Sequence, residues 1–257
     1  MERRGLKPIR LFSSDLDGTL AGDRDASVEF ARLWQALPDG ERPLLVYNSG
    51  RLIEDIMEFT WEQGLPQADF LIGGVGTMMH SYDHPHMSDQ YTALIADGFD
   101  VDLIEAELVM MERLTRQPAQ YQHDYKSSWY LHDATADDIL ELEQMLASSG
   151  HRTRVVYSSA RDLDVLPDVA DKGKALAWLC GELEIGLDEV VVAGDTGNDR
   201  AMFELDGVRG IMPGNALPEL VSLAQARPGM IATQGTAARG VIDGLKEFGV
   251  FTTPKDN

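Results

Sequence analysis

The chain contains little cysteine and few basic residues for its length. Cys180 is the one cysteine among 257 residues, so an internal disulfide is excluded and a reducing compartment such as the cytoplasm is expected. Lysine and arginine number 22 against 43 aspartates and glutamates, which gives a formal net charge of −21. Nucleic acids and anionic membranes bind basic surfaces, so we expect neither as a partner.

Long apolar runs are also missing. No stretch approaches the roughly 18 consecutive apolar residues of a membrane-spanning helix, and residues 1–5 lack the apolar region of a signal peptide. We therefore expect a cytoplasmic protein of one or two domains, with enough hydrophobic residues (44%) for a full core. An acidic chain that binds an anionic substrate needs local cations, either a metal ion or particular lysine and arginine side chains.

Three short hydrophobic runs end in polar residues. Residues 9–12 lead to Asp15 and Asp17, residues 44–47 lead to 48–51, and residues 190–193 lead to 194–199. Hydrophobic runs that alternate with helical patterns are typical of buried parallel strands in an α/β sheet. Ligands bind at the carboxyl ends of such strands. The pattern therefore predicts an α/β fold with one site assembled from three distant segments.

Helical patterns separate these strands. They cover residues 26–37, 52–63, 174–183 and 200–205. A further strand, 69–73, enters the glycine-rich turn 73–76. This turn does not complete a G-x-G-x-x-G motif, because Met79 occupies the place of the third glycine, so a nucleotide site is not favoured.

The middle third of the chain has a different pattern. From about Ser81 it begins as a loop and continues as a helix over 102–113, a strand over 127–131, a helix over 136–147 and a strand over 153–157. We interpret it as a second α/β unit inserted into the first. The expected division is a Rossmann-like parallel-sheet core made of residues 1–80 and 165–257, with the insertion at 81–164.

Asp15 and Asp17 can face one substrate, because alternate residues of an extended segment point the same way. Gly18 then allows a sharp turn. Two neighbouring carboxylates repel each other unless a cation lies between them or one is protonated. The pair therefore indicates either a Mg²⁺ site or a nucleophile beside a general acid, although an ordinary turn is the simpler alternative for this segment alone.

Asp195 and Asp199 stand four residues apart where a strand passes into a helix. Asp195 could reach the cation that Asp15 binds, and Asp199 could hold a metal-bound water or a neighbouring side chain. Ligands that are all oxygen favour Mg²⁺ over zinc. The alternative for this segment is helix capping by Asp195.

A transferred phosphoryl group needs its oxygens neutralised. Ser49 can donate a hydrogen bond to one oxygen, and Gly50 beside it adds no bulk. Lys172 stands at an expected helix start, where anions are favoured, and Lys174 is an equal competitor by position.

Four segments in this order resemble the motifs of the haloacid dehalogenase superfamily: D-L-D-G-T (15–19), N-S-G-R (48–51), D-K-G-K-A-L (171–176) and G-D-T-G-N-D (194–199). The resemblance implies that Asp15 is the nucleophile and Asp17 the acid and base of a phosphatase. It implies that Lys172, rather than Lys174, is the motif lysine. It also implies that Lys172 and Ser49 bind the phosphoryl oxygens. It also implies Mg²⁺ held by four residues: Asp15, the backbone carbonyl of Asp17, Asp195 and Asp199.

More narrowly, the chain is similar to the sucrose-phosphate phosphatase family in residues 73–76, 126–131 and 157–167. This resemblance implies that the inserted unit is a cap that recognises a sugar. The substrate-binding residues it indicates are Ser49, Gly50, Arg51, His123, Lys126, Asp162 and Asn198.

The implied activity is Mg²⁺-dependent hydrolysis of a non-reducing disaccharide phosphate through an aspartyl-phosphate. Mannosylfructose-phosphate is the first expectation for this substrate and sucrose 6-phosphate the alternative. A sugar-phosphate mutase and an inactive sugar-phosphate sensor remain open. The partners expected are this small molecule and, by association, the glycosyltransferase that makes it. The sequence indicates no oligomeric state.

Two further groups have alternative interpretations. His80, Asp83, His84 and His86 could bind zinc, but a polar hinge between core and cap is favoured. Trp129 and Tyr130 alternate along a strand, so one is expected to pack inward while the other could stack on a sugar ring.

Overall fold

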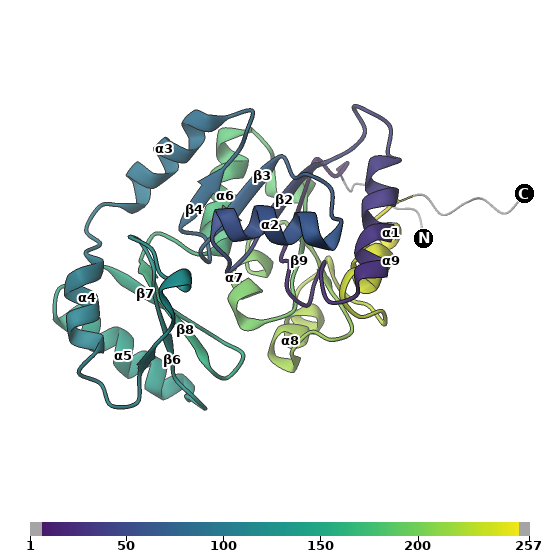
Figure 1. The fold of residues 1–257 in the computed structure, drawn as a ribbon. Coiled ribbons are helices and arrows are strands. Elements are labelled where there is room, and N and C mark those ends of the chain that lie inside the picture. Colours follow the sequence, from purple (N-terminus) through teal and green to yellow (C-terminus); the bar gives the residue numbers. More distant parts are fainter. Residues whose placement is uncertain (1–6, 252–257) are drawn as a thin grey trace, which may run out of the picture.

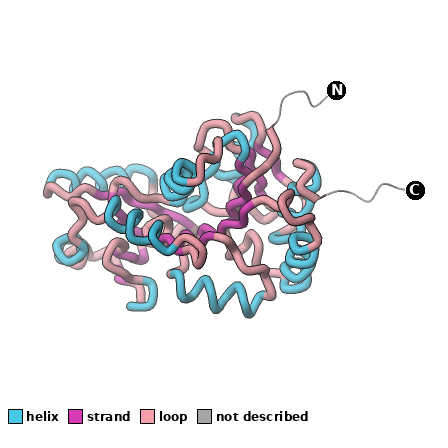
Figure 2. The backbone as a smooth tube through the Cα atoms, turned by 90° about the horizontal axis from the view of Figure 1, so that it is seen from above, coloured by secondary structure: helices cyan, strands magenta, loops and turns pink. Residues whose placement is uncertain are grey.

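The computed structural model describes residues 7–251, apart from the side chains of residues 224 and 225. Two α/β units are visible, one with a seven-stranded sheet and one with a four-stranded sheet (Figure 1). The view from above in Figure 2 again separates the two groups of strands along the molecule. No helix within the described residues is both long enough and apolar enough to cross a membrane.

The larger sheet has the strand order β11-β10-β9-β1-β2-β3-β4. All neighbouring strands are parallel except β3 and β4, which form an antiparallel pair. The strands are β1 (Leu11–Ser14), β2 (Leu44–Asn48), β3 (Phe70–Gly73), β4 (Met78–His80), β9 (Val190–Ala193), β10 (Arg209–Met212) and β11 (Met230–Ala232). The expected parallel-sheet core is confirmed.

Alternate residues of each strand pack into two separate hydrophobic layers. Leu11 faces one layer and Phe12 the other. The layer with Phe12 contains α1 (Arg24–Gln35), α2 (Ile53–Gln63) and α9 (Ala237–Glu247). The layer with Leu11 contains α3 (Pro85–Ile95), α6 (Lys172–Glu182), α7 (Arg200–Phe203) and α8 (Pro218–Ala226). We call this sheet with its seven helices the core unit.

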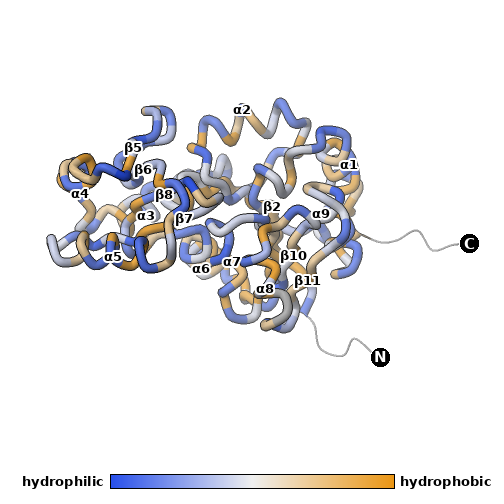
Figure 3. The backbone as a smooth tube through the Cα atoms, turned by 90° about the horizontal axis from the view of Figure 1, so that it is seen from below, coloured by the Kyte–Doolittle hydropathy of each residue, from blue (hydrophilic) through white to orange (hydrophobic). Residues whose placement is uncertain are grey.

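The helix α1 shows why these segments fold as they do. Ala26, Phe30 and Trp34 are spaced four residues apart, which places all three on one buried face. Asp23 caps the helix by accepting a hydrogen bond from the Ala26 amide at 3.2 Å. Figure 3 shows the resulting alternation of polar and apolar residues along α1 and α2.

The smaller sheet has the order β5-β6-β8-β7 and is antiparallel. Its strands are β5 (Thr115–Arg116), β6 (Ser127–Tyr130), β7 (Thr153–Ser158) and β8 (Asp162–Pro167). Two helices, α4 (Val101–Leu108) and α5 (Ala136–Ser148), share one hydrophobic layer with inward residues of this sheet such as Trp129 and Leu163. We call this sheet with α4 and α5 the cap unit. The described residues also form three short 3₁₀ helices: η1 (Ala119–Tyr121), η2 (Leu187–Glu189) and η3 (Gly197–Asp199).

Several expected boundaries were wrong. The first strand begins two residues later than expected, and the helix expected over 102–113 ends at Leu108. The segment after Ser81 was expected to be a loop but contains α3. Met87, Tyr91 and Ile95 of this helix pack into the core unit, and the Tyr91 hydroxyl donates to the Gly76 carbonyl at 2.6 Å.

The division of the chain at residues 80 and 164 stays a prediction. Two features lie close to these boundaries. The helix α3 packs on the core unit although it follows residue 80, and β8 continues to Pro167 within the cap unit.

Candidate active site

Three polar loops lie side by side because their strands are neighbours in the sheet. The order β9-β1-β2 brings together the loops that follow Ala193, Ser14 and Asn48. Asp15 comes from the loop after β1, Ser49 from the loop after β2, and Asp195 from the loop after β9. These are the carboxyl ends of parallel strands, where α/β proteins bind ligands.

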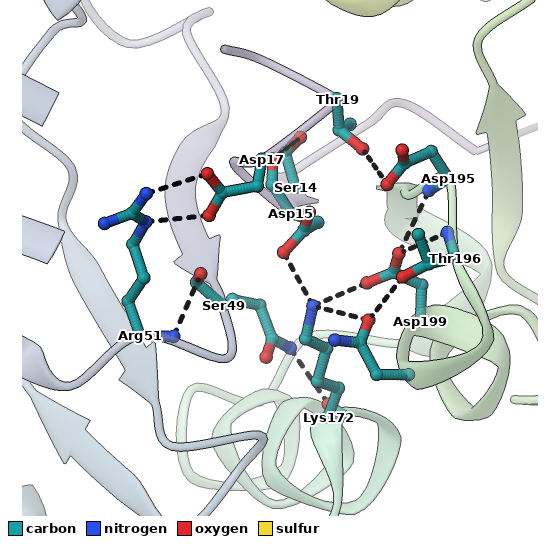
Figure 4. Close-up of polar contacts among 12 residues, drawn as sticks. Ser14, Asp15, Asp17, Thr19, Ser49, Arg51, Lys172, Asp195, Thr196 and Asp199 are labelled. Atoms are coloured by element: carbon teal, nitrogen blue, oxygen red, sulfur yellow. Dashed lines mark hydrogen bonds and ion pairs between the residues drawn. The ribbon is translucent and has the colours of Figure 1, made fainter. Parts of the chain in front are cut away.

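Lys172 lies at the centre of the site (Figure 4). Its ammonium donates to Asp15 Oδ1 at 2.7 Å, Asp199 Oδ1 at 2.6 Å and Asn198 Oδ1 at 3.2 Å. Burial alone lowers the pKa of Lys172, but the charges of Asp15 and Asp199 outweigh burial and raise it. Lys172 is therefore a permanent cation inside the site.

The helix α6 and the last residue of β2 hold Lys172 in this position. Asp171 caps α6 by accepting from the Lys174 amide at 2.7 Å. The Asn48 side chain donates to the Lys172 carbonyl at 2.9 Å. Lys174 instead has a largely exposed side chain that donates to the Asp168 carbonyl. Of the two lysines, Lys172 is the one that the fold brings to Asp15.

Three buried carboxylates converge beside this lysine. Among the described residues, Asp15, Asp195 and Asp199 offer ligand oxygens that all lie within 4.8 Å of one another. Burial, partly offset by Lys172, raises the pKa of Asp15 well above its ordinary range. Burial and the charge of Asp199 raise the pKa of Asp195 to about 7.

The donor set fits a divalent cation. Three carboxylates surround one ammonium, so negative charge exceeds positive charge in a buried volume, and a cation would relieve the repulsion. The ligand atoms are all oxygen, which suits Mg²⁺ better than zinc.

Asp199 also organises the loop in which it lies. Its second oxygen accepts hydrogen bonds from the amides of Asp195 and Thr196, each at 3.0 Å. Its carboxylate therefore contacts Lys172 with one oxygen and fixes the loop with the other. The expected metal-bound water or neighbouring side chain for Asp199 is, in this structure, the Lys172 side chain.

Asp17 points away from the three carboxylates toward Arg51 (Figure 4). Arg51 donates to the two Asp17 oxygens at 2.7 and 2.8 Å and to Asp55 at 2.9 Å. Its guanidinium carbon lies 3.7 Å from the centre of the Phe59 ring. The hydrogen bonds with Asp17 raise the pKa of Arg51 further. A contact between Arg51 and Asp17 was not expected from the sequence.

A cavity of about 720 Å³ lies between the core unit and the cap unit. Asp15, Asp17 and six of the seven expected substrate-binding residues line it. These six are Ser49, Gly50, Arg51, Lys126, Asp162 and Asn198. The lining residues that the sequence reasoning missed include Gln117, Gln120, Tyr121, Ser158, Ser159, Arg161 and Asp164.

The cap unit contributes the polar face of its sheet to this cavity. Ser128 pairs with Asp164 across β6 and β8, and Tyr130 pairs with Asp162. Because side chains alternate along a strand, these residues face away from the layer that contains Trp129. As expected for this pair, Trp129 packs inward and Tyr130 lines the cavity.

Lys126 is buried at the base of this polar face, with 3% of its surface exposed. Its ammonium lies 3.5 Å from Asp164 Oδ1, and the Ser128 hydroxyl donates to the same oxygen at 2.5 Å. Lys126 is therefore not an exposed surface lysine.

His123 lies outside the cavity, so its position does not support the expected sugar contact. Its Nε2 is 2.5 Å from Thr77 Oγ1, and its Nδ1 accepts from the Tyr125 amide at 3.2 Å. Thr77 donates its own hydroxyl to the Gly74 carbonyl, so His123 donates from Nε2. Burial and the charge of Lys126 lower the pKa of His123 to about 3. His123 is therefore a neutral side chain that joins the cap unit to the turn after β3.

The histidine cluster near residue 80 does not converge on a metal position. The ring of His84 stacks on Phe70, with centroids 5.6 Å apart, and His80 packs against Tyr82 at 4.8 Å. The cluster extends from the end of β4 to the first turn of α3, within the core unit.

Asn215 and Thr19 are residues that sequence reasoning missed. Thr19 donates to Asp195 Oδ1 at 3.2 Å, and Asn215 donates to Asp195 Oδ2 at 3.2 Å. Asn215 follows β10, which is the next strand beyond β9. Asn215 could have been predicted in the same way as the residues of the other three loops, because it also follows the carboxyl end of a parallel strand.

Comparison with known proteins identifies the family and the fold of this chain. The sucrose-6F-phosphate phosphohydrolase family model matches residues 8–249. A mannosylfructose-phosphate phosphatase from Agrobacterium fabrum is 53% identical over 245 residues, which is 95% of this chain and 99% of that protein.

Solved structures give the same result. The sucrose-phosphatase from Synechocystis sp. PCC6803, in complex with sucrose and phosphate, has a TM-score of 0.84 at 27% identity and covers 96% of this chain and 100% of its own. A haloacid dehalogenase-like hydrolase from Bacillus subtilis shares the fold, with a TM-score of 0.63 at 15% identity over 94% of this chain and 92% of its own. The chain thus belongs to the sucrose-6F-phosphate phosphohydrolase family within the haloacid dehalogenase-like fold, and it is a phosphoric monoester hydrolase.

Proposed function

We propose that this chain is a Mg²⁺-dependent phosphatase that hydrolyses a non-reducing disaccharide phosphate. Mannosylfructose-phosphate is the favoured substrate, because the 53% identical relative carries that name and matches over nearly its full length. Sucrose 6-phosphate is the alternative, because the family model and the sucrose-phosphatase structure carry that name.

One observation carries the proposal: the same cavity contains Asp15 at one end and the polar face of β6 and β8 at the other. Its volume of about 720 Å³ falls in the range of roughly 300–1,000 Å³ typical of small-molecule sites. A phosphate bound near Asp15 would leave the attached sugar rings against hydroxyl, carboxylate and ammonium groups of the cap unit, which can hydrogen-bond to sugar hydroxyls.

In the first step, we expect Asp15 to attack phosphorus in line with the leaving sugar. Lys172 occupies Asp15 Oδ1, so the other carboxylate oxygen is the expected nucleophile. The new bond joins that oxygen to phosphorus, and the bond from phosphorus to the sugar oxygen breaks. Asp17 gives its proton to the departing alkoxide. Lys172 and Ser49 donate to the phosphoryl oxygens and neutralise their charge.

In the second step, Asp17 takes a proton from a water molecule that attacks the aspartyl-phosphate. The bond between phosphorus and Asp15 breaks, and inorganic phosphate leaves.

Asp17 must release Arg51 to reach the departing oxygen, since Arg51 holds both of its carboxylate oxygens in this structure. We expect this release to accompany closure of the cap unit over the bound sugar, which also excludes bulk water.

The metal would be held by Asp15, Asp195, the backbone carbonyl of Asp17 and, through water or directly, Asp199. Bound there, Mg²⁺ supplies positive charge that shields the phosphoryl oxygens from the carboxylate nucleophile.

Release of inorganic phosphate from a set of sugar phosphates tests the substrate proposal. We expect the highest kcat/KM for mannosylfructose-phosphate, with sucrose 6-phosphate second, and lower values for trehalose-phosphate and hexose phosphates. A sugar-phosphate mutase would form an isomer without releasing phosphate. Preference for a simple hexose phosphate over both disaccharide phosphates would overturn the proposed substrate class.

Removal of the metal is expected to abolish activity. Excess EDTA should reduce phosphate release to background, and MgCl₂ should restore it. CaCl₂ should not restore it, because Ca²⁺ takes six to eight oxygens at longer distances and would engage Asp15 as a ligand. Full activity in excess EDTA would refute the metal site.

The variant Lys126→Ala is expected to lose activity selectively on the disaccharide phosphate. The ammonium is buried in the cap face, and a lost hydrogen bond to a buried sugar hydroxyl costs about 1–3 kcal/mol, roughly 5- to 150-fold in kcat/KM. p-Nitrophenyl phosphate contains no sugar that could contact the cap unit, so its hydrolysis should change far less. Equal losses on both substrates would make Lys126 a folding residue.

Arg113→Ala provides the matched control for Lys126→Ala. Arg113 also belongs to the inserted segment, but its side chain is 58% exposed and pairs with Asp138 rather than lining the cavity. This control should leave both reactions unchanged. Thermal unfolding of each variant shows whether the fold is retained.

Location and association stay proposals. We propose a cytoplasmic protein, which suits a buried thiol at Cys180 whose pKa burial raises to about 12. We also propose association with the glycosyltransferase that makes the disaccharide phosphate. Co-purification of the two proteins from cells tests the association.

A further inference from the structure

We infer that Asn215 is a positioning residue that fixes the carboxylate of Asp195 in the orientation needed to hold the cation. The inference rests on the proposed metal site and adds a residue outside the four matched motifs. Asn215 lies in the loop between β10 and α8, and its side chain reaches the start of α9.

The Asn215 amide joins three separate segments of the core unit. Its Nδ2 donates to the Gly18 carbonyl at 2.8 Å and to Asp195 Oδ2 at 3.2 Å. Its Oδ1 accepts from the Ala237 amide at 2.7 Å. A carbonyl only accepts and a backbone N–H only donates, so these partners fix which end of the amide faces Asp195. An aspartate could satisfy Ala237 but not Gly18 or Asp195.

Contacts with several other residues restrict the orientation of Asp195. Its Oδ1 accepts from the Thr19 hydroxyl at 3.2 Å, and its backbone carbonyl accepts from the Leu217 amide at 2.8 Å. Gly18 has a φ of +75°, and a Cβ at this position would overlap Asp195 Oδ2. The absence of a side chain at Gly18 therefore makes space for the Asp195 carboxylate, and Asn215 contacts the carboxylate with a hydrogen bond.

Both hydrogen-bond donors to the Asp195 side chain are neutral. An arginine or lysine in place of Asn215 would compete with a cation for the carboxylate charge, whereas an amide or hydroxyl orients the carboxylate and leaves its charge in place. Groups that orient a metal ligand in this way typically contribute about 10- to 100-fold in metal affinity.

The test is a calorimetric titration of the metal-free protein with MgCl₂ alone. Asn215→Leu is expected to weaken Mg²⁺ binding about tenfold or more, because leucine has a similar volume and no charge but cannot donate to Gly18 or Asp195. Asn215→Ala should weaken binding as well. Both variants also lose the hydrogen bond from the Ala237 amide, and unfolding in EDTA measures that separate effect on stability.

Thr233→Val is the matched control. Thr233 donates to the Met212 carbonyl in the same group of loops and has no contact with Asp195. It should lower the unfolding temperature without changing Mg²⁺ affinity.

The possible outcomes separate two failures. Wild-type protein that binds no Mg²⁺ in the titration would overturn the proposed metal site itself. Mg²⁺ binding that is as strong in Asn215→Leu as in the wild type, or that Thr233→Val weakens equally, would overturn the role of Asn215 alone. Weaker Mg²⁺ binding in both Asn215 variants but not in Thr233→Val supports the inference.

Discussion

Replacement of Asp15 by asparagine is expected to reduce phosphate release roughly a thousandfold or more, as removal of a catalytic nucleophile does in other hydrolases. An amide cannot form the acyl-phosphate, so the first chemical step is lost. The fold should be retained, because the amide oxygen can still accept from Lys172. Phosphate release and thermal unfolding measure the two effects.

The direction in which Asp15→Asn changes the unfolding temperature follows from the pKa of Asp15. Burial raises the pKa of Asp15, so its ionised form is less favourable in the folded protein than in the unfolded chain. This stability term is present at low pH and is lost as the pH rises through the folded pKa. A neutral asparagine avoids the loss, so Asp15→Asn in EDTA at pH 8 should unfold at the wild-type temperature or above it.

Asp25→Asn is the matched control, since Asp25 is an exposed aspartate on α1 outside the cavity. It should leave activity unchanged. Mass spectrometry must show that the introduced asparagine in the Asp15→Asn variant has not deamidated to aspartate. A tenth of the wild-type activity, with deamidation excluded, would contradict the role of Asp15.

The meeting of Asp15, Ser49 and Asp195 could be predicted because it depends on topology. Parallel strands end at one edge of a sheet, so residues that follow three hydrophobic runs must gather there whatever their separation in sequence. The same logic was not extended to β10, because Arg209 and Gly210 weaken its hydrophobic pattern. Asn215 was missed for this reason.

The contact between Arg51 and Asp17 could not be predicted in the same way. Arginine is long and flexible, and its partner depends on which carboxylates the fold places within its reach. Asp17, Asp55 and Phe59 all contact Arg51 here, and only Asp55 and Phe59 are near it in sequence.

The cap unit shows where alternation helps and where it fails. Lys126, Ser128 and Tyr130 lie on one face of the strand region because side chains alternate. The family resemblance indicated Lys126, whereas alternation alone left open which of Trp129 and Tyr130 packs inward. His123 lies before β6, where the alternation of side chains along a strand no longer predicts which way a side chain points. Its ring contacts Thr77. The helix α3 was missed because His84 and Pro85 suggest a loop, although proline is well accommodated in the first turn of a helix.

Replacement of Lys172 by methionine is expected to remove activity and to destabilise the metal-free protein. Methionine keeps much of the side-chain volume but leaves Asp15 and Asp199 buried without their shared ammonium. Removal of one partner from a buried ion pair costs about 3–5 kcal/mol. Phosphate release should fall at least a hundredfold, because the phosphoryl oxygens lose the buried ammonium donor beside Asp15.

The destabilisation by Lys172→Met should depend on pH and on the metal. Lys172 lowers the pKa of Asp15 against the effect of burial, so its loss raises that pKa further. A carboxyl group with a raised folded pKa stabilises the protein at low pH and loses this contribution as the pH rises through that pKa. The fall in unfolding temperature, measured in EDTA, should therefore be larger at pH 8 than at pH 5, and MgCl₂ should reduce it at pH 8.

Lys174→Met separates this effect from the loss of any lysine on α6. Lys174 lies two residues away with its side chain 44% exposed, so the control should change activity and unfolding little at either pH. If Lys172→Met lowers the unfolding temperature equally at pH 5 and pH 8, the lysine acts through packing alone. If the two variants behave alike, the buried cluster of Asp15, Lys172 and Asp199 is not what organises the site. A pH-dependent loss confined to Lys172→Met would show that this ammonium offsets the repulsion among the carboxylates that perform the chemistry.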